Sequence, residues 1–114
     1  MLKGLGGLGD MAKMVKQAQE MQEKLARMQE DLANITVTGE SGAGLVRATA
    51  TAKGDLTALS IDPSIFNPND KEVVEDLILA AIKDAQARAA DRHREELQRL
   101  SESLGLPPGI QLPI

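Results

Sequence analysis

One stretch decides the fold: residues 10–35 read DMAKMVKQAQEMQEKLARMQEDLANI. Apolar residues recur along it in alternating steps of three and four, the a/d pattern of a heptad repeat. They are Met11, Met14, Ala18, Met21, Leu25, Met28, Leu32 and Ile35. Because mostly charged and amide side chains lie between them, the pattern predicts a helix with one narrow apolar seam, roughly 37 Å long at 1.5 Å per residue. A helix cannot bury its own seam, so we expect a second helix to lie along it.

The overall composition favours a small dimeric protein of a reducing compartment. The chain has 114 residues, no cysteine and a single aromatic side chain, Phe66. This length suits one domain, and the absence of cysteine excludes disulfides and thiolate metal sites. No run of about 18 apolar residues occurs, so we expect a cytoplasmic protein without a membrane partner. Because large apolar side chains are scarce, the core of a lone chain would be thin, and we expect a homodimer.

The segments on either side of the first helix have a different composition. Residues 1–9 are rich in glycine and predict a flexible tail, with Asp10 as the N-cap of the helix. After the helix, β-favouring residues and glycine-containing turns alternate, which is typical of strands joined by tight turns. We expect a three-stranded antiparallel sheet with strands at residues 35–40, 45–53 and 56–62.

A second long helix is predicted after the sheet. It begins within residues 67–70, where asparagine provides a cap and proline suits the first helical position, and it runs to about Ser103. Gly105 ends it, and a Pro-rich tail follows over residues 105–114. The fold class is therefore α+β, with one α-β-β-β-α domain over residues 10–104.

The net charge of −4 is unevenly distributed along the chain. Acidic residues are in excess over residues 67–84, where the dipole at the start of the second helix favours anions. Lysine and arginine are in excess at the start of the first helix and in the second half of the other. Since the first helix runs toward the sheet and the second away from it, we expect the two basic segments to meet at one tip. The candidate phosphate contacts are Lys3, Lys13, Lys16, Lys24, Arg27, Arg88, Arg92, Arg94 and Arg99.

The second and third strands alternate so that small and branched apolar side chains share one face. We expect this face of the sheet, with the roots of both helices, to form the interface between two copies of the chain. The candidate interface residues are Val46, Ala48, Ala50, Leu59 and Ile61.

Four segments resemble the YbaB/EbfC family of nucleoid-associated proteins, and they occur in the family's order over nearly the whole chain. They are residues 16–24 (KQAQEMQEK), 37–46 (VTGESGAGLV), 61–64 (IDPS) and 106–109 (LPPG). The resemblance implies a small bacterial protein of the cytoplasm and nucleoid that binds DNA as a homodimer. It further implies a central β core with helical arms, and a role in shaping DNA and influencing gene expression.

The expected DNA-binding mode is contact with the phosphate backbone of a duplex, with low sequence specificity. No recognition helix is evident, and aromatic side chains for base stacking are lacking. The alternative is a protein–protein interaction module that docks a partner on its heptad seam.

An enzyme has little support in this sequence. A single histidine, His93, and no cysteine provide neither a nucleophile–base pair nor a metal cluster, so we expect no catalytic residues, metal or cofactor. Gly4, Gly6 and Gly9 have G-x-G-x-x-G spacing, but a nucleotide-binding fingerprint needs a strand directly before it. We therefore expect no small-molecule substrate.

Overall fold

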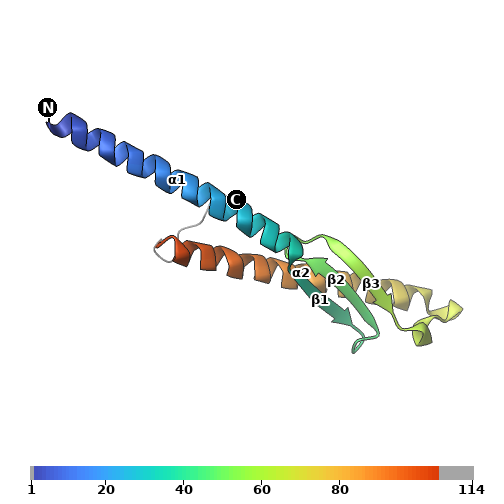
Figure 1. Ribbon diagram of the computed structural model, residues 1–114. Helices are drawn as coiled ribbons and strands as arrows, with labels where there is room; N and C mark the ends of the chain where they lie inside the picture. Colours follow the sequence, from blue (N-terminus) through green and yellow to red (C-terminus); the bar gives the residue numbers. More distant parts are fainter. Residues whose placement is uncertain (1, 106–114) are drawn as a thin grey trace.

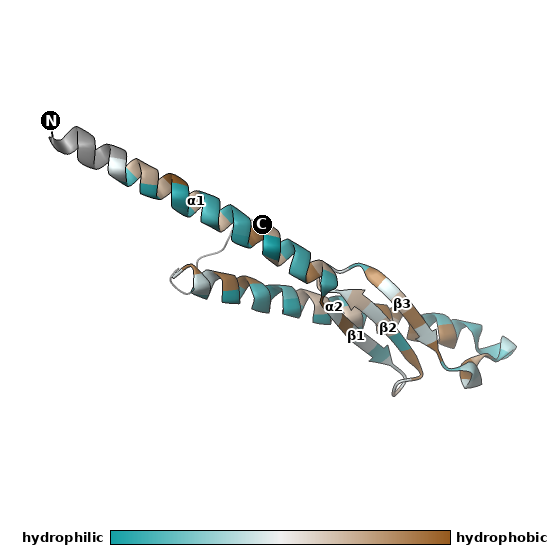
Figure 2. Cartoon of the chain, in the orientation of Figure 1, coloured by the Kyte–Doolittle hydropathy of each residue, from teal (hydrophilic) through white to brown (hydrophobic). Residues whose placement is uncertain are grey.

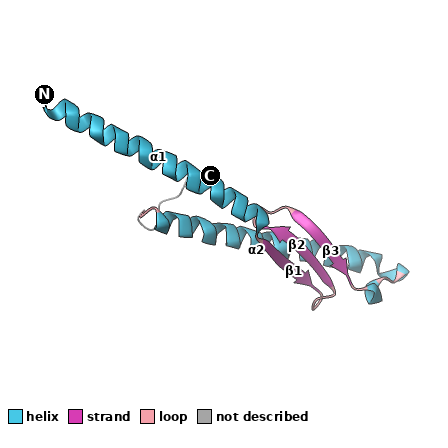
Figure 3. Cartoon of the chain, in the orientation of Figure 1, coloured by secondary structure: helices cyan, strands magenta, loops and turns pink. Residues whose placement is uncertain are grey.

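Figure 1 shows a computed structural model of the chain, which describes residues 2–105, with side chains from Gly9 onward. Two long helices flank a three-stranded sheet, as the colouring by secondary structure in Figure 3 makes plain. The elements are α1 (Leu2–Asn34), β1 (Thr36–Ser41), β2 (Val46–Thr51), β3 (Leu56–Ile61), η1 (Pro63–Ile65), η2 (Pro68–Asp70) and α2 (Lys71–Ser103). The predicted α+β class and element order are confirmed.

The molecule is strongly elongated. Its principal extents are 84 × 22 × 17 Å, and its radius of gyration is 21.9 Å. A compact chain of this length has a radius of gyration of about 13 Å. The difference comes from α1, whose outer part extends beyond the end of α2 (Figure 1).

Helix α1 ends at Asn34, as predicted, but it begins earlier than we expected. Residues 2–9 are part of the helix, so the prediction that they form a tail without regular structure is wrong. Asp10 therefore lies inside the helix and is not its N-cap. Each glycine costs a helix about 1 kcal/mol relative to alanine, which was the basis of that prediction. Adding a residue to an existing helix avoids the cost of nucleation, so a glycine-rich segment can extend it.

The sheet has the order β1-β2-β3, with both pairs antiparallel. Gly39 of β1 is the partner of Ala48 of β2, which in turn is the partner of Leu59 of β3. Directly opposed residues share a face, so the side chains of Ala48 and Leu59 and the bare Cα of Gly39 lie on the same side of the sheet. The turn between β2 and β3 contains Gly54 at φ +95°, a conformation that favours glycine.

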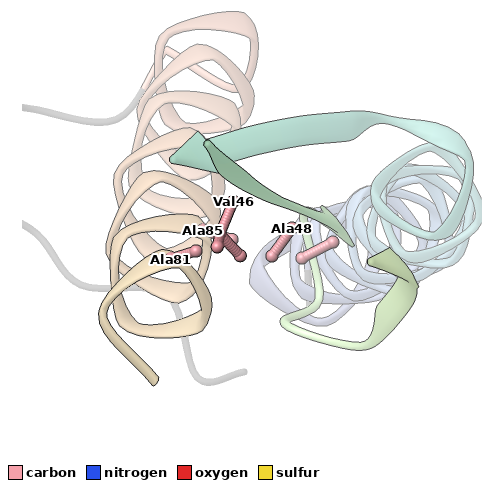
Figure 4. Close-up of a cluster of buried hydrophobic side chains, with 5 residues drawn as sticks. Val46, Ala48, Ala81 and Ala85 are labelled. Atoms are coloured by element: carbon pink, nitrogen blue, oxygen red, sulfur yellow. The ribbon is translucent and has the colours of Figure 1, made fainter. Parts of the chain in front are cut away.

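Helix α2 packs on this face through small residues. Figure 4 shows Ala81 and Ala85 of α2 directed at Val46 and Ala48 of β2, and all four are fully buried. Gly39 allows this approach, because a Cβ built there would lie 2.1 Å from the Ala85 backbone nitrogen. Because Gly39 has no side chain, the backbones of β1 and α2 lie closer together here than any other residue would allow.

Two polar contacts hold the edge of β1 to the same helix. The backbone N–H of Glu40 donates a hydrogen bond to Asp84 Oδ2 at 3.0 Å. The hydroxyl of Ser41 donates to the backbone carbonyl of Leu77 at 2.5 Å. Helix α2 therefore packs on the face of β1 and also occupies the Glu40 N–H at its outer edge, which removes one donor that another strand could use.

A second apolar cluster joins the two helices. Met28 and Leu32 of α1 are buried with Ala52 and with Leu100 of α2. The heptad seam thus has the predicted helical partner, but only over its second half. Met28 is 6% exposed, whereas Met14, two heptads earlier, is 67% exposed.

We predict that Gly39→Ala destabilises the protein by about 3 kcal/mol, because the added methyl group overpacks the contact with α2. The nearest atoms are backbone atoms of Ala85 and Ala81, which cannot move without displacing the helix. Urea unfolding followed by circular dichroism measures the change.

The matched control is Gly9→Ala, since a Cβ at Gly9 meets no atom within 4 Å. This variant should be neutral or slightly stabilising, because alanine has the higher helix propensity. Equal destabilisation by the two variants would contradict the close approach at Gly39.

Candidate nucleic-acid interface

Two unpaired lysines occupy the part of α1 that extends beyond α2. Lys13 and Lys16 are exposed, and within the described residues neither makes an ion pair, although Asp10 precedes Lys13 and Glu20 follows Lys16 by about one turn. The side chain of Lys3 lies outside the described residues. An exposed ammonium group without an acidic partner is free to contact a phosphate.

The basic and apolar residues of this segment lie on different faces. Successive helical residues are about 100° apart, so Lys16 projects about 160° from Met14 and Lys13 about 100° from it. A ligand bound through the lysines would therefore leave the exposed methionine seam uncovered.

The arginines of α2 are in a different state, because every one is paired with an acidic residue of the same helix. Arg88 Nε lies 3.2 Å from Asp84 Oδ2, and Arg94 forms an ion pair with Asp91. Arg92 and Arg99 share Glu96 as partner: Glu96 Oε1 lies 3.3 Å from Arg92 Nε and 2.9 Å from Arg99 Nη1. The contact with Arg92 does not have hydrogen-bond geometry. These pairs lower the local positive field, so the arginines are weaker phosphate contacts than their number implies.

The predicted single basic tip is not formed. Helix α2 ends where Leu104 shares a groove with Ala18 and Met21, so Lys13 and Lys16 lie farther out along α1. At a rise of 1.5 Å per residue, about 24 Å of helix separates Ala18 from the start of α1. The tip prediction assumed that both helices leave the sheet at their ends, whereas the sheet covers the first half of α2 (Figure 1).

The remaining basic candidates lie between the sheet and the end of α2. Lys24, Arg27 and Arg99 line one shallow groove together with Asp31 and Glu96. Arg88 and Arg92 line another with residues 37 and 38 of β1 and two acidic residues of α2. Each groove thus mixes both signs of charge, and neither is a concentrated anion site.

Three of the five predicted interface residues are buried within the chain. Val46, Ala48 and Ala50 are fully covered by α2, so they have no surface left for a second copy. The alternating pattern identified a buried face correctly, but it cannot tell whether the chain's own helix or a partner covers it. Leu59 on the same face is 48% exposed, and Ile61 is half-buried.

Sequence reasoning overlooked two exposed lysines away from α1. Lys53 lies in the turn after β2 and Lys83 on α2, and neither makes an ion pair within the described part of the chain. Their neighbours in the sequence are not basic, so no cluster marked them. They provide a comparison for the two lysines of α1.

The described residues include few side chains that could hold a metal ion or catalyse a reaction. In the described part of the chain, no three His, Cys, Asp or Glu side chains are grouped for a metal ion. His93 is half-buried, and its Nε2 has no hydrogen-bond partner there. A hollow of about 420 Å³ at the start of α2 is lined mainly by apolar groups, including Phe66, Pro68 and Val74.

The fold and charges define a class: an elongated α+β protein that carries exposed lysines on a projecting helix. The YbaB/EbfC DNA-binding family model matches residues 7–104, and the chain belongs to this family. The resemblance to this family is thereby confirmed; the segments at residues 16–24, 37–46 and 61–64 lie within the matched range, and residues 106–109 lie outside it.

Curated relatives support this assignment, and a solved structure shares the fold. A nucleoid-associated protein of Nitrobacter hamburgensis is 44% identical over 89 residues, which cover 78% of this chain and 84% of the relative. A protein of the same name from Nitrobacter winogradskyi is 44% identical over 87 residues, covering 76% and 82%. An uncharacterised Helicobacter pylori protein of known structure has the same fold, with a TM-score of 0.68 at 20% identity, over 78% of this chain and 94% of that one.

We predict that Asp84→Asn destabilises the protein at neutral pH and that the effect disappears in acid. The Glu40 N–H, and then the Arg88 guanidinium, donate to this carboxylate and hold the pKa of Asp84 below its usual value. Its contribution to stability is therefore complete above the unfolded-state pKa of about 4 and is lost as the pH falls through the lower folded-state pKa.

Urea unfolding of both proteins at pH 7 and in steps below pH 4 tests this. The two midpoints should differ most at pH 7 and converge in acid. A difference that is constant with pH would show that the charge of Asp84 contributes nothing.

Proposed function

We propose that this protein is a nucleoid-associated protein that binds double-stranded DNA as a homodimer through its projecting helices, shaping DNA and influencing gene expression. The observation that carries the proposal is the pair of exposed, unpaired lysines, Lys13 and Lys16, in a member of a DNA-binding family. Relatives that match this chain over most of their length bear the name nucleoid-associated protein. The proposed location is the nucleoid, within the cytoplasm.

The chemistry of the arm favours phosphates over bases. Lysine is a point charge on a flexible stem, which suits phosphate contacts that position a protein without reading sequence. The one aromatic side chain, Phe66, lies before the start of α2 rather than on the arm. Low sequence specificity follows from this set of groups.

A second copy fits the uncovered side of β3. This strand is at the edge of the sheet, and all of its residues from Leu56 to Ser60 are exposed. Leu59 lies on the face that α2 covers over β2, but α2 does not extend over β3. Pairing of two such strands would bury apolar surface and would place two arms on one particle.

The family is a DNA-binding family and not an enzyme family, and no described helix is long and apolar enough to cross a membrane. The alternative function is a protein–protein interaction module. Exposed Met11 and Met14 on the heptad seam favour it, since flexible methionine side chains adapt to different partners. Titration with duplex DNA separates the two functions.

We predict that the double variant Lys13→Gln, Lys16→Gln weakens duplex binding about tenfold or more at low salt. The slope of log affinity against log salt should flatten by about one for each phosphate that the variant no longer neutralises. The effect should be the same on unrelated DNA sequences. Fluorescence anisotropy with labelled duplexes at several salt concentrations measures both quantities.

Lys53→Gln with Lys83→Gln is the matched control, since it removes the same charge from two exposed, unpaired lysines elsewhere. Its salt slope should stay within experimental error of the parent. If both double variants weakened binding equally, the arm would have no special role, and an unchanged Lys13, Lys16 variant would favour the protein-interaction alternative.

We predict that Leu59→Glu shifts the protein from dimer to monomer, because it places a charge on the proposed apolar interface. The control Ser60→Glu adds the same charge on the opposite face of β3 and should leave the dimer largely intact. Light scattering coupled to gel filtration gives both masses. A monomeric parent protein, or a dimer that persists in Leu59→Glu, would exclude this interface.

A further inference from the structure

The heptad seam of α1 loses its partner part-way along its length. Its second half packs on Leu97 and Leu100 of α2 and on Leu104, directly after that helix. Beyond the end of α2 the seam continues with Met14 and Met11, which are 67% and 62% exposed. In Figure 2, brown segments alternate with teal ones along this outer part of α1. An apolar strip of this kind is costly to leave in water.

Helix α2 ends beside the point on α1 where the exposed apolar strip begins. Leu104, directly after α2, lines a groove of about 390 Å³ with Ala18 and Met21 of α1. Gly105 follows at φ +71°, the left-handed conformation that ends helices. The described part of the chain therefore ends beside the seam, at Ala18, one turn from Met14.

That segment has the composition of a docking strand. Residues 106–114 read LPPGIQLPI, with four aliphatic side chains, three prolines and no charge. Its prolines are incompatible with a helix interior and favour an extended chain of about 3.1 Å per residue. Nine such residues span about 28 Å, whereas the seam from Ala18 to Met11 is only about 10 Å long.

We propose that residues 106–114 fold back along α1 of the same chain and cover Met11 and Met14. The match rests on position, length and chemistry: an apolar segment with stiff prolines loses little entropy when it docks in an apolar groove. Because Lys16 projects from the opposite side of α1, the docked segment leaves the basic face open. The proposal concerns the fold of the arm and does not depend on DNA binding.

Disulfide trapping tests the proposal directly, because the chain has no native cysteine. In Met14→Cys, Ile110→Cys, oxidation should form an intrachain disulfide, seen as a shifted monomer on a non-reducing gel. The control Ala12→Cys, Ile110→Cys carries its first cysteine about 200° around the helix from position 14. A freely moving segment would reach both positions alike, whereas a docked one should react about tenfold faster at position 14.

A second measurement uses no cysteine. Serine at Leu106, Ile110, Leu112 and Ile114 keeps the length of the segment but removes its aliphatic groups. Amide hydrogen exchange over residues 11–18 should then accelerate about fivefold, with the amides of β2 unchanged. Equal disulfide rates at positions 12 and 14, disulfides formed only between chains, or unchanged exchange would each overturn the proposal. Interchain disulfides would assign the seam to a second copy instead.

Discussion

The closeness of α2 to the sheet is the constraint on which the other contacts depend. Gly39 removes the side chain that would hold the two backbones apart, and the fully buried Ala81 and Ala85 fill the narrow space that remains. Only at this separation do Asp84 and the Leu77 carbonyl reach the edge of β1. The same contact places the end of α2 beside the middle of α1 and so determines how much of α1 extends alone.

A core built from small residues buries little apolar area, and this has consequences for the rest of the surface. Leu59 on β3 and Met14 on α1 are large apolar side chains that the chain's own described elements leave exposed. They lie at different places, one at the edge of the sheet and one on the projecting helix. We therefore propose different occupants for the two surfaces, a second copy at β3 and the chain's own C-terminal segment on α1.

The distribution of charge separates the two lysines of the projecting helix from the main acidic excess of the chain. The acidic excess lies at the start of α2, while Lys13 and Lys16 lie on the outer half of α1, toward the other end of a molecule 84 Å long. Exposed charges are screened over a Debye length of about 8 Å at physiological salt. A phosphate near the lysines is thus affected by their immediate neighbours and hardly by the net charge of −4.

The periodicity of the sequence was sufficient to predict the order of elements, the end of α1 at Asn34 and the end of α2 at Ser103, because local signals encode these features. The periodicity did not predict the features that depend on packing between segments far apart in the sequence. Whether Ala48 faces a helix of its own chain or a partner depends on where α2 docks. The pairing of Arg94 with Asp91 depends on rotamers, and the helical state of the glycine-rich start depends on the helix that follows.

The length of the molecule also affects how it moves through solvent. A particle of 84 × 22 × 17 Å experiences more friction than a sphere of equal mass and tumbles much faster about its long axis than end over end. Even a single chain would therefore sediment slowly and elute early from a sizing column. Orientation-dependent relaxation should differ between amides of α1, whose N–H bonds follow the long axis, and those of the strands.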